Sequence, residues 1–232
     1  MSALALNTAS LKYDNGFTAL NNVTAQFNSG SFTALVGPSG CGKSSLLRLL
    51  AGLEQPFIGS VTGLAQSQIG FVFQEPTLLA WRSVADNITL PLQIEGHSSN
   101  EIAARLDEAL ALVGLTDFAD TLPRQLSGGM KMRVSLARAL AKRPPVLLMD
   151  EPFAALDELT RFRLDDDLRA IWQQQKCTII FVTHSVTEAA YLAERALVMQ
   201  GGEIQKEIAI NQTGRDSGFR SAPAFTAACN AL

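Results

Sequence analysis

One short run of the sequence has the residue types that can cradle phosphate groups. It reads Gly-Pro-Ser-Gly-Cys-Gly-Lys-Ser-Ser and fits the pattern G-x-x-x-x-G-K-[ST]. Glycines let the backbone curl so that successive N–H groups point at phosphate oxygens, and a following helix adds partial positive charge. Lys43 is expected to reach the β- and γ-phosphates, and the Ser44 hydroxyl to bind Mg²⁺. The candidate nucleotide-binding residues of this phosphate loop are Gly37, Pro38, Ser39, Gly40, Cys41, Gly42, Lys43, Ser44 and Ser45.

Polar side chains also follow three short aliphatic runs that read as buried strands. They are Gln74 after residues 69–73, Asp150 and Glu151 after residues 146–149, and His184 after residues 178–183. The carboxyl ends of parallel strands form the ligand-binding edge of an α/β sheet. We expect Asp150 to bind Mg²⁺ opposite Ser44, and Glu151 to polarise an attacking water. We expect His184 to donate a hydrogen bond to the γ-phosphate, and Gln74 to bind Mg²⁺ or the water.

Other polar residues have simpler interpretations. Taken alone, Asp150 and Glu151 would equally fit a cap of the next turn, and it is the phosphate loop that favours chemistry. His97 lies between Gly96 and Ser98 in a polar turn and is expected at the surface. The run from Asp165 to Asp167 suggests a metal site at first sight. Asp165, however, lies four residues from both Arg161 and Arg169, so the spacing predicts a solvated charged face.

Short aliphatic runs alternate with longer helical patterns, which predicts an α/β fold with a mainly parallel sheet core. Early strands separated by turn residues predict an antiparallel β edge portion. Almost no strand pattern lies between residues 74 and 144, which predicts a helical insertion. The residues after about 211 show no clear period, and we assign them no function. Strands are expected at 4–11, 23–27, 32–36, 69–73, 146–149, 178–183 and 196–199, and helices at 43–51, 84–93, 100–113, 128–142, 158–174 and 186–193.

Composition narrows the classes of protein that the chain can belong to. Its 232 residues include 19 basic and 22 acidic side chains, a net charge of −3 that argues against nucleic acid as a partner. No run approaches the ~20 apolar residues of a membrane span, and the first residues do not resemble a secretory signal. Cys41, Cys177 and Cys229 share no ligand-like spacing, so reduced thiols are expected.

A second glycine-containing segment supplies another candidate anion site. Ser127, Gly128 and Gly129 precede a helical pattern, with Ser127 as a natural N-cap. Taken alone, this serine–glycine segment would more simply be an ordinary capped helix. The order of the motifs favours a different interpretation. The phosphate loop, Gln74, the serine–glycine segment, Asp150-Glu151, Leu156-Asp157 and His184 together resemble the ATP-binding subunit of an ABC transporter, over residues 4–208.

This resemblance implies a P-loop ABC ATPase fold with a mainly parallel sheet core, an antiparallel β edge portion and a helical subdomain. It implies one domain over residues 1–232, with a nucleotide-binding core (1–74 and 145–208), a helical subdomain (75–144) and a tail of unknown role (209–232). Two subunits, expected to be identical, would sandwich two ATP molecules with Mg²⁺. Each ATP would then lie between one phosphate loop and the partner's Ser127, Gly128 and Gly129.

Further roles also come from the resemblance. Tyr13, thirty residues before Lys43, would stack on adenine, although a tyrosine at a strand end also fits simple core packing. Asp157 would belong to the loop that couples the two sites. Gln74 and the helical insertion would form a groove for a helix of an integral-membrane permease. The subunit would then work at the cytoplasmic face of the inner (plasma) membrane, as a peripheral protein, with an extracytoplasmic solute-binding protein as an indirect partner.

Finer features point to a branch of the family. Residues 71–84 and 156–161 are similar to importers of nitrate, sulfonate and taurine, whose relatives also carry thiamine-precursor pyrimidines. Ala80 replaces the proline that is usual in this branch, and Met130 replaces the usual glutamine after the serine–glycine segment. The stretch from 52 to 74 is shorter than usual, which predicts a trimmed edge hairpin.

Three alternatives remain beside the importer ATPase. A separately encoded exporter pair would have the same cassette on its own chain. A soluble ABC ATPase of DNA repair or translation would typically carry a coiled-coil insertion or a second cassette, and this sequence has neither. A P-loop kinase or GTPase would leave the serine–glycine segment unexplained.

Overall fold

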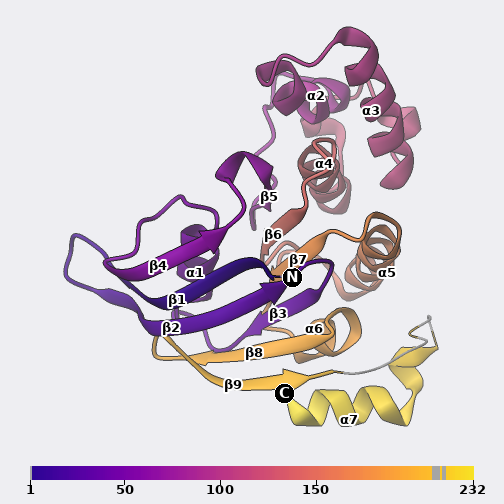
Figure 1. The fold of residues 1–232 in the computed structure, drawn as a ribbon. Coiled ribbons are helices and arrows are strands. Elements are labelled where there is room, and N and C mark those ends of the chain that lie inside the picture. The colour runs from indigo at the N-terminus through magenta and orange to yellow at the C-terminus, as the bar shows by residue number, and fades with distance from the viewer. Residues whose placement is uncertain (1, 211–214, 216–217) are drawn as a thin grey trace.

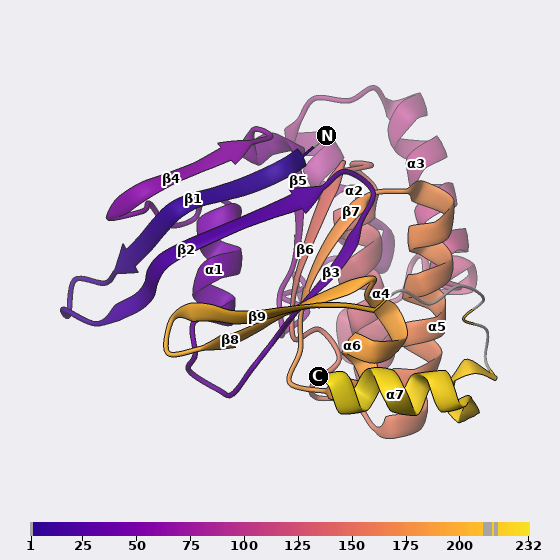
Figure 2. The same ribbon diagram turned by 60° about the horizontal axis from the view of Figure 1, so that its bottom comes forward.

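Two β-sheets and seven α-helices make up the described part of the chain (Figure 1). The computed structural model describes residues 2–210, 215 and 218–232. The larger sheet has helices packed around it, and the smaller sheet lies to one side of it (Figures 1 and 2). The predicted fold class, an α/β protein with a mainly parallel core and an antiparallel edge portion, is confirmed.

The larger sheet has six strands in the order β5-β6-β7-β3-β8-β9. The first five are parallel, and β9 pairs antiparallel with β8. Every residue of β3 and β7 is buried, which explains their unbroken apolar sequences. The strands are β3 (Phe32–Val36), β5 (Ile69–Val72), β6 (Val146–Asp150), β7 (Thr178–Val182), β8 (Arg195–Gln200) and β9 (Glu203–Ala209).

The smaller sheet is antiparallel, with β1 (Ser2–Lys12) between β2 (Thr18–Asn28) and β4 (Ile58–Gly63). β4 was not expected from the sequence, because it is mostly exposed and contains glycine. Its Gly59 has φ +82°, and a Cβ there would lie 2.3 Å from the carbonyl oxygen of Thr8. Only glycine fits so close to the neighbouring strand, so this residue marks a strand instead of breaking one.

Three helices lie between β5 and β6 and stand apart at the top of Figure 1. They are the helices expected in the insertion at residues 75–144. Serine or aspartate caps five of the chain's helices by accepting a backbone N–H bond, as Ser83, Ser98, Ser127, Asp157 and Ser185 do. The helices are α1 (Lys43–Leu50), α2 (Val84–Ile94), α3 (Ser99–Leu112), α4 (Gly128–Leu140), α5 (Glu158–Gln175), α6 (Val186–Leu192) and α7 (Pro223–Ala231).

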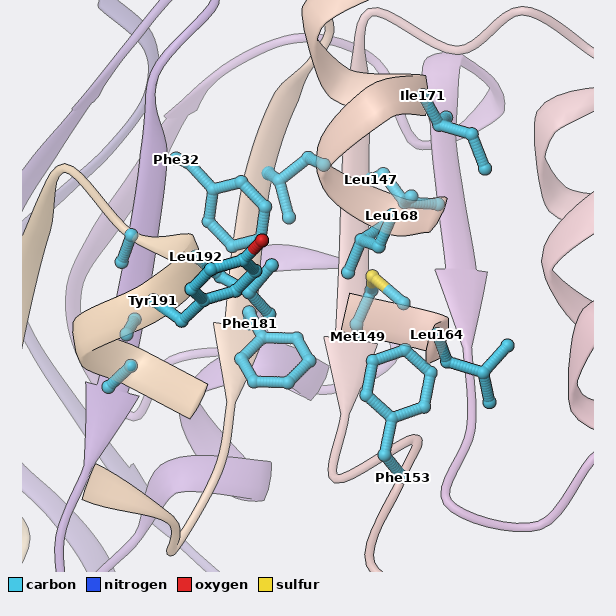
Figure 3. Close-up of a cluster of buried hydrophobic side chains, with 14 of the residues drawn as sticks. Phe32, Leu147, Met149, Phe153, Leu164, Leu168, Ile171, Phe181, Tyr191 and Leu192 are labelled. Atoms are coloured by element: carbon cyan, nitrogen blue, oxygen red, sulfur yellow. The ribbon is translucent and has the colours of Figure 1, made fainter. Parts of the chain in front are cut away.

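Apolar side chains from α5, α6 and three central strands form one hydrophobic cluster (Figure 3). Leu164, Leu168 and Ile171 of α5 are buried in it, which is the apolar stripe expected from their spacing. A second cluster fills the space between α1 and the smaller sheet. The central strands are thus covered on both faces, which fixes their carboxyl ends in place.

The C-terminal segment contains α7, which the sequence did not predict, while residues 211–214 and 216–217 lie outside the described residues. This segment overturns one expectation. Asp165 is 1% exposed, and its Oδ2 lies 3.3 Å from Nη2 of Arg220, so the predicted solvated face is wrong there. Its expected partners bind elsewhere: Arg161 pairs with Glu188, and Arg169 donates to backbone carbonyls.

Candidate functional site

The carboxyl ends of β5, β6, β7 and β3 lie along one edge of the larger sheet, in that order. The parallel registers place Asp150 opposite Val182, and Leu35 opposite the same residue. The segments after these strands therefore begin side by side. They carry Gln74 after β5, Asp150 and Glu151 at the end of β6, His184 after β7, and the phosphate loop after β3.

The phosphate loop needs glycine at two of its positions. Gly37 has φ +153°, and a Cβ there would lie 2.2 Å from the carbonyl oxygen of Met199. Gly42 has φ +105°, caps α1, and would meet the Ala19 carbonyl oxygen at 2.6 Å. The loop thus packs its backbone against β8 and β2, and larger side chains would push it out of place.

Lys43 is held inside this loop. Its side chain is 5% exposed, and its Nζ donates to the carbonyl oxygens of Gly37 and Pro38, both at 2.9 Å. These bonds hold the ammonium group against the curled backbone, at the start of α1. That is the position from which a cation meets phosphate oxygens bound by the loop.

Ser44 and Asp150 form a pair of oxygen ligands. The Ser44 hydroxyl donates to Oδ1 of Asp150 at 2.8 Å. Burial raises the pKa of Asp150, the bond from Ser44 opposes that shift, and the nearby Glu151 charge adds to it. A nearby cation would stabilise the charged form of a carboxylate in this position. The two hard oxygens fit Mg²⁺, which typically takes one or two protein ligands and completes its shell with phosphate and water.

Glu151 and His184 form a second pair, on the segments that follow β6 and β7. Oε2 of Glu151 lies 3.3 Å from Nδ1 of His184, and the histidine side chain is half exposed. Glu151 has φ +44°, in the left-handed region that non-glycine residues rarely adopt, and its N–H donates to the Val182 carbonyl at 3.1 Å. Strain of this kind is typical of residues whose position matters for function.

Two more predicted site residues lie at this edge. The hydroxyl groups of Tyr13 and Ser45 are 3.1 Å apart, so Tyr13 is beside the phosphate loop, while its ring also packs on the second apolar cluster. Gln74 is exposed just after β5. Stacking of Tyr13 on adenine and metal binding by Gln74 stay predictions.

The serine–glycine segment lies at the start of α4. The Ser127 hydroxyl accepts a bond from the Met130 N–H at 3.2 Å, and Ser127 and Gly128 are exposed. A Cβ on Gly129 would lie 2.8 Å from Cγ2 of Thr160. Among the described residues, no hydrogen bond joins this segment to the phosphate loop of the same chain. Ser127 and Gly128 are thus open to solvent, whereas Gly129 is buried against α5.

Three charged residues near the site, Arg138, Arg161 and Glu188, form contacts that the sequence did not predict. Arg138 of α4 binds the segment after Gln74, and Arg161 of α5 pairs with Glu188 of α6. Each contact joins residues at least 27 positions apart, so local spacing could not reveal it. Their partners are backbone carbonyls or a carboxylate on another element, which only the fold brings together.

A large cavity lies elsewhere in the described part of the chain. It has a volume of about 1160 Å³ and lies at the amino-terminal edge of the sheet, where Pro144, Pro145, Lys176 and Cys177 precede β6 and β7. Its described lining includes no residue of the phosphate loop. Pro38, Ser39 and Gly40 of the phosphate loop are exposed to solvent, so a nucleotide on this open edge would stay partly uncovered by this chain.

Comparison with known proteins gives consistent results. The sequence profile described as ABC transporter matches residues 20–154. An aliphatic sulfonates import ATP-binding protein of Pseudomonas syringae pv. tomato is 45% identical over 204 residues, which cover 87% of this chain and 85% of that protein. A nitrate import ATP-binding protein of Synechocystis sp. is 44% identical over 205 residues, covering 84% and 77%.

Solved structures agree with these relatives. A dimeric ATP-binding cassette in a post-hydrolysis state, bound to ADP and Pi, has a TM-score of 0.80 and 32% identity, and the match covers 90% of this chain and 99% of that one. Within the residues described here, no helix is both long and apolar enough to cross a membrane.

Proposed function

Because this chain belongs to the ABC transporter family, as an ATP-hydrolysing subunit that energises an importer, we propose roles for its site residues, its metal and its partners. One observation carries the proposal. Two polar pairs, Ser44–Asp150 and Glu151–His184, lie on adjoining segments of one sheet edge beside the buried ammonium of Lys43. Charge-binding groups and a candidate base thus converge where the phosphates of ATP would bind.

Each residue has one task in this proposal. The loop's N–H groups and Lys43 bind the β- and γ-phosphates, and Ser44 and Asp150 hold Mg²⁺, with Gln74 as a further ligand. Mg²⁺, when bound, supplies positive charge to the phosphate oxygens. Glu151 accepts a proton from water as the water oxygen attacks the γ-phosphorus, and ADP leaves with the bridging oxygen. His184 donates a hydrogen bond to the γ-phosphate, and its Nδ1 contact with Glu151 keeps both side chains at the reacting group. Tyr13 stacks on adenine.

A second copy of the chain completes each site. Ser127, Gly128 and Gly129 of the partner would bind the γ-phosphate from the opposite side, and Asp157 would join the two sites. The open edge supports this, because a nucleotide bound to one chain alone stays exposed to water. The dimeric form of the related cassette that holds ADP and Pi supports it too.

The other partners are an integral-membrane permease and, indirectly, an extracytoplasmic solute-binding protein. The permease helix would bind between the core (1–74 and 145–208) and the helical subdomain (75–144), at the cytoplasmic face of the membrane. The segment between β5 and α2 supports this, because Phe73 is 39% exposed and Trp81 is 76% exposed. Large exposed apolar side chains in one segment are typical of a protein interface. No role is proposed for the tail (209–232) in this contact.

The solute is proposed to be a small oxyanion of the nitrate, sulfonate or taurine class. Relatives at 44% and 45% identity have names that refer to nitrate and aliphatic sulfonates import. The solute itself does not contact this chain in the proposal, because the permease and the binding protein select it.

Phosphate release by the purified chain tests the chemistry. We expect the rate of hydrolysis per chain to rise with protein concentration, and to fall to zero when EDTA removes Mg²⁺. In Lys43→Ala, both hydrolysis and ATP binding measured by calorimetry should be lost. Unchanged ATP affinity in Lys43→Ala would contradict the assigned phosphate loop.

Uptake of labelled nitrate and taurine tests the transport role. It is compared in cells that lack the chain and in cells resupplied with wild type or Glu151→Gln. Equal uptake in all of them would contradict the transport role for these solutes.

A further inference from the structure

Two loops flank Glu151 at the sheet edge. The Asp157 loop (residues 151–157) begins at Glu151 and ends at Asp157, which caps α5 by accepting the Thr160 N–H at 3.0 Å. The His184 loop (residues 183–185) follows β7 and ends at Ser185, which caps α6 by accepting the Glu188 N–H at 3.2 Å. Each loop is thus fixed to the first turn of a different helix.

Arg161, in the first turn of α5, binds the Asp157 loop. Its Nη2 donates to the carbonyl oxygen of Leu156 at 3.0 Å, and its backbone N–H donates to that of Asp157 at 2.9 Å. The same guanidinium reaches the other helix, because its Nε lies 3.3 Å from Oε1 of Glu188. One side chain therefore contacts both the Asp157 loop and α6.

Glu188 binds the His184 loop in a similar way. Its side chain is nearly fully buried, and its Oε2 accepts a hydrogen bond from the hydroxyl of Thr183, the residue before His184. The Thr183 hydroxyl oxygen also accepts the Ser185 N–H at 2.9 Å. The carboxylate thus holds the Thr183 hydroxyl, which in turn bonds the other end of the turn that carries His184.

The charges make this contact costly to break. Burial raises the pKa of Glu188, while the Thr183 hydrogen bond and the Arg161 charge lower it. Thr183 and Arg161 are thus the main groups that favour the charged form of this buried carboxylate. Removal of one partner leaves a charged group buried without compensation, and such groups move or become neutral.

We propose that Arg161 and Glu188 act as one positioning unit that fixes the His184 loop relative to the Asp157 loop. The unit sets the rate of ATP hydrolysis, whereas nucleotide affinity comes mainly from the phosphate loop, to which neither side chain belongs. A displacement of either loop is transmitted to the other through this ion pair. The inference rests on the proposed roles of Glu151, His184 and Asp157.

The test compares Glu188→Gln, Arg161→Gln, the double variant and Arg161→Lys by ATP hydrolysis. Rates are measured against ATP and against protein concentration, so that turnover is separated from nucleotide affinity and from dimer formation. We expect kcat to fall about tenfold in either single variant, with KM for ATP within about twofold of wild type. The double variant should match the slower single variant, because each change already breaks the unit. Arg161→Lys should recover part of the rate, since it keeps the charge.

Asp165→Asn is the matched control. Like Glu188, Asp165 is a buried acidic residue beside an arginine. It belongs to α5, and its Oδ2 lies 3.3 Å from Nη2 of Arg220, which belongs to the C-terminal segment. Its kcat should stay within about twofold of wild type. An equal loss of kcat in this control would show a general effect of destabilisation and overturn the inference.

Two further results would also overturn it: a folded Glu188→Gln chain with wild-type kcat, or losses that multiply in the double variant. If Glu188→Gln does not fold, Arg161→Gln and Arg161→Lys decide, because the arginine side chain is partly exposed. A wild-type chain without hydrolysis would instead contradict the proposed function.

Discussion

At the scale of single residues, Asp165 shows how strongly the fold can change the chemistry of a side chain. Burial raises its pKa to about 8, the Glu188 charge adds to the shift, and the Arg220 charge opposes it. Only Oδ2 contacts Arg220, and Oδ1 has no hydrogen-bond partner among the described residues. The native state therefore holds a proton on Asp165 at pH values where the unfolded chain has released it.

This proton predicts a pH dependence of stability. The unfolded carboxyl has a pKa near 3.8 and the folded one near 8, so folding takes up a proton between these values. The contribution of the Asp165 proton to the free energy of unfolding is complete below pH 4 and is lost as the pH rises through 8. Within that window one proton changes the free energy of unfolding by about 1.4 kcal/mol per pH unit. Urea unfolding of wild type and Asp165→Asn at pH 5 to 8 should show a shallower decline in the variant. Parallel curves would contradict the raised pKa.

The same residue shows what the sequence could not reveal. The phosphate loop was located from nine consecutive residues, and the structure places Lys43 and Ser44 at the sheet edge with the acids that follow β6. Asp165 was assigned to arginines four residues away, while its partner in the structure is 55 residues away. A local pattern identifies a site built by one loop, but it cannot identify a pair whose members come together only through tertiary packing.

At the scale of elements, Arg138 joins α4 to the segment that follows Gln74. Its guanidinium donates to the carbonyl oxygens of Pro76 and Thr77, both at 2.9 Å, and to the Thr77 hydroxyl at 3.0 Å. Thr77 has φ +47°, so these bonds hold a left-handed backbone. The helix that begins after Ser127 is thereby linked to the segment proposed to contact the permease.

Loss of these donors should loosen that segment. In Arg138→Met a side chain of similar length has no donor, and we expect the free energy of unfolding to fall by about 3 kcal/mol. Hydrogen exchange of residues 74–80 should become faster, and Arg138→Lys should lie between the variant and wild type. Arg163→Met, which removes an exposed arginine of α5, serves as the control and should change neither quantity. Unchanged exchange at 74–80 in Arg138→Met would contradict the link.

The elements differ in how well the sequence predicted them. The central strands β3, β6 and β7 were predicted within a residue or two, because strands covered on both faces are uniformly apolar. β9 was missed, although Gly201 and Gly202, with φ +59° and +81°, form the two-residue turn that joins it to β8. α7 was missed because its contacts with α6 lie more than 30 residues away, and its own sequence has no clear helical period.

At the scale of the whole molecule, the two candidate phosphate-binding segments of one chain do not form one site. Lys43 is buried in its loop, while the exposed Ser127 at the start of α4 has no described hydrogen bond to that loop. In the proposed two-subunit site, an ATP molecule bound at the sheet edge would present its γ-phosphate to the partner. The bonds that the partner's N–H groups would make with that phosphate would then drive closure, and hydrolysis would remove them.

Glu151→Gln should trap this closed state. The amide keeps the size of the side chain but cannot accept a proton from water, so ATP binds and turnover falls by about 10²–10⁴. Size-exclusion with light scattering should show a monomer without nucleotide and a dimer with ATP and Mg²⁺, and ADP should return the monomer. A chain that carries Lys43→Ala as well should stay monomeric with ATP, because its loop no longer holds the nucleotide that joins the two subunits. A monomer of the single variant under saturating ATP and Mg²⁺ would contradict the two-subunit site, whereas an ATP-dependent dimer that still turns over rapidly would contradict only the role of Glu151 as the base.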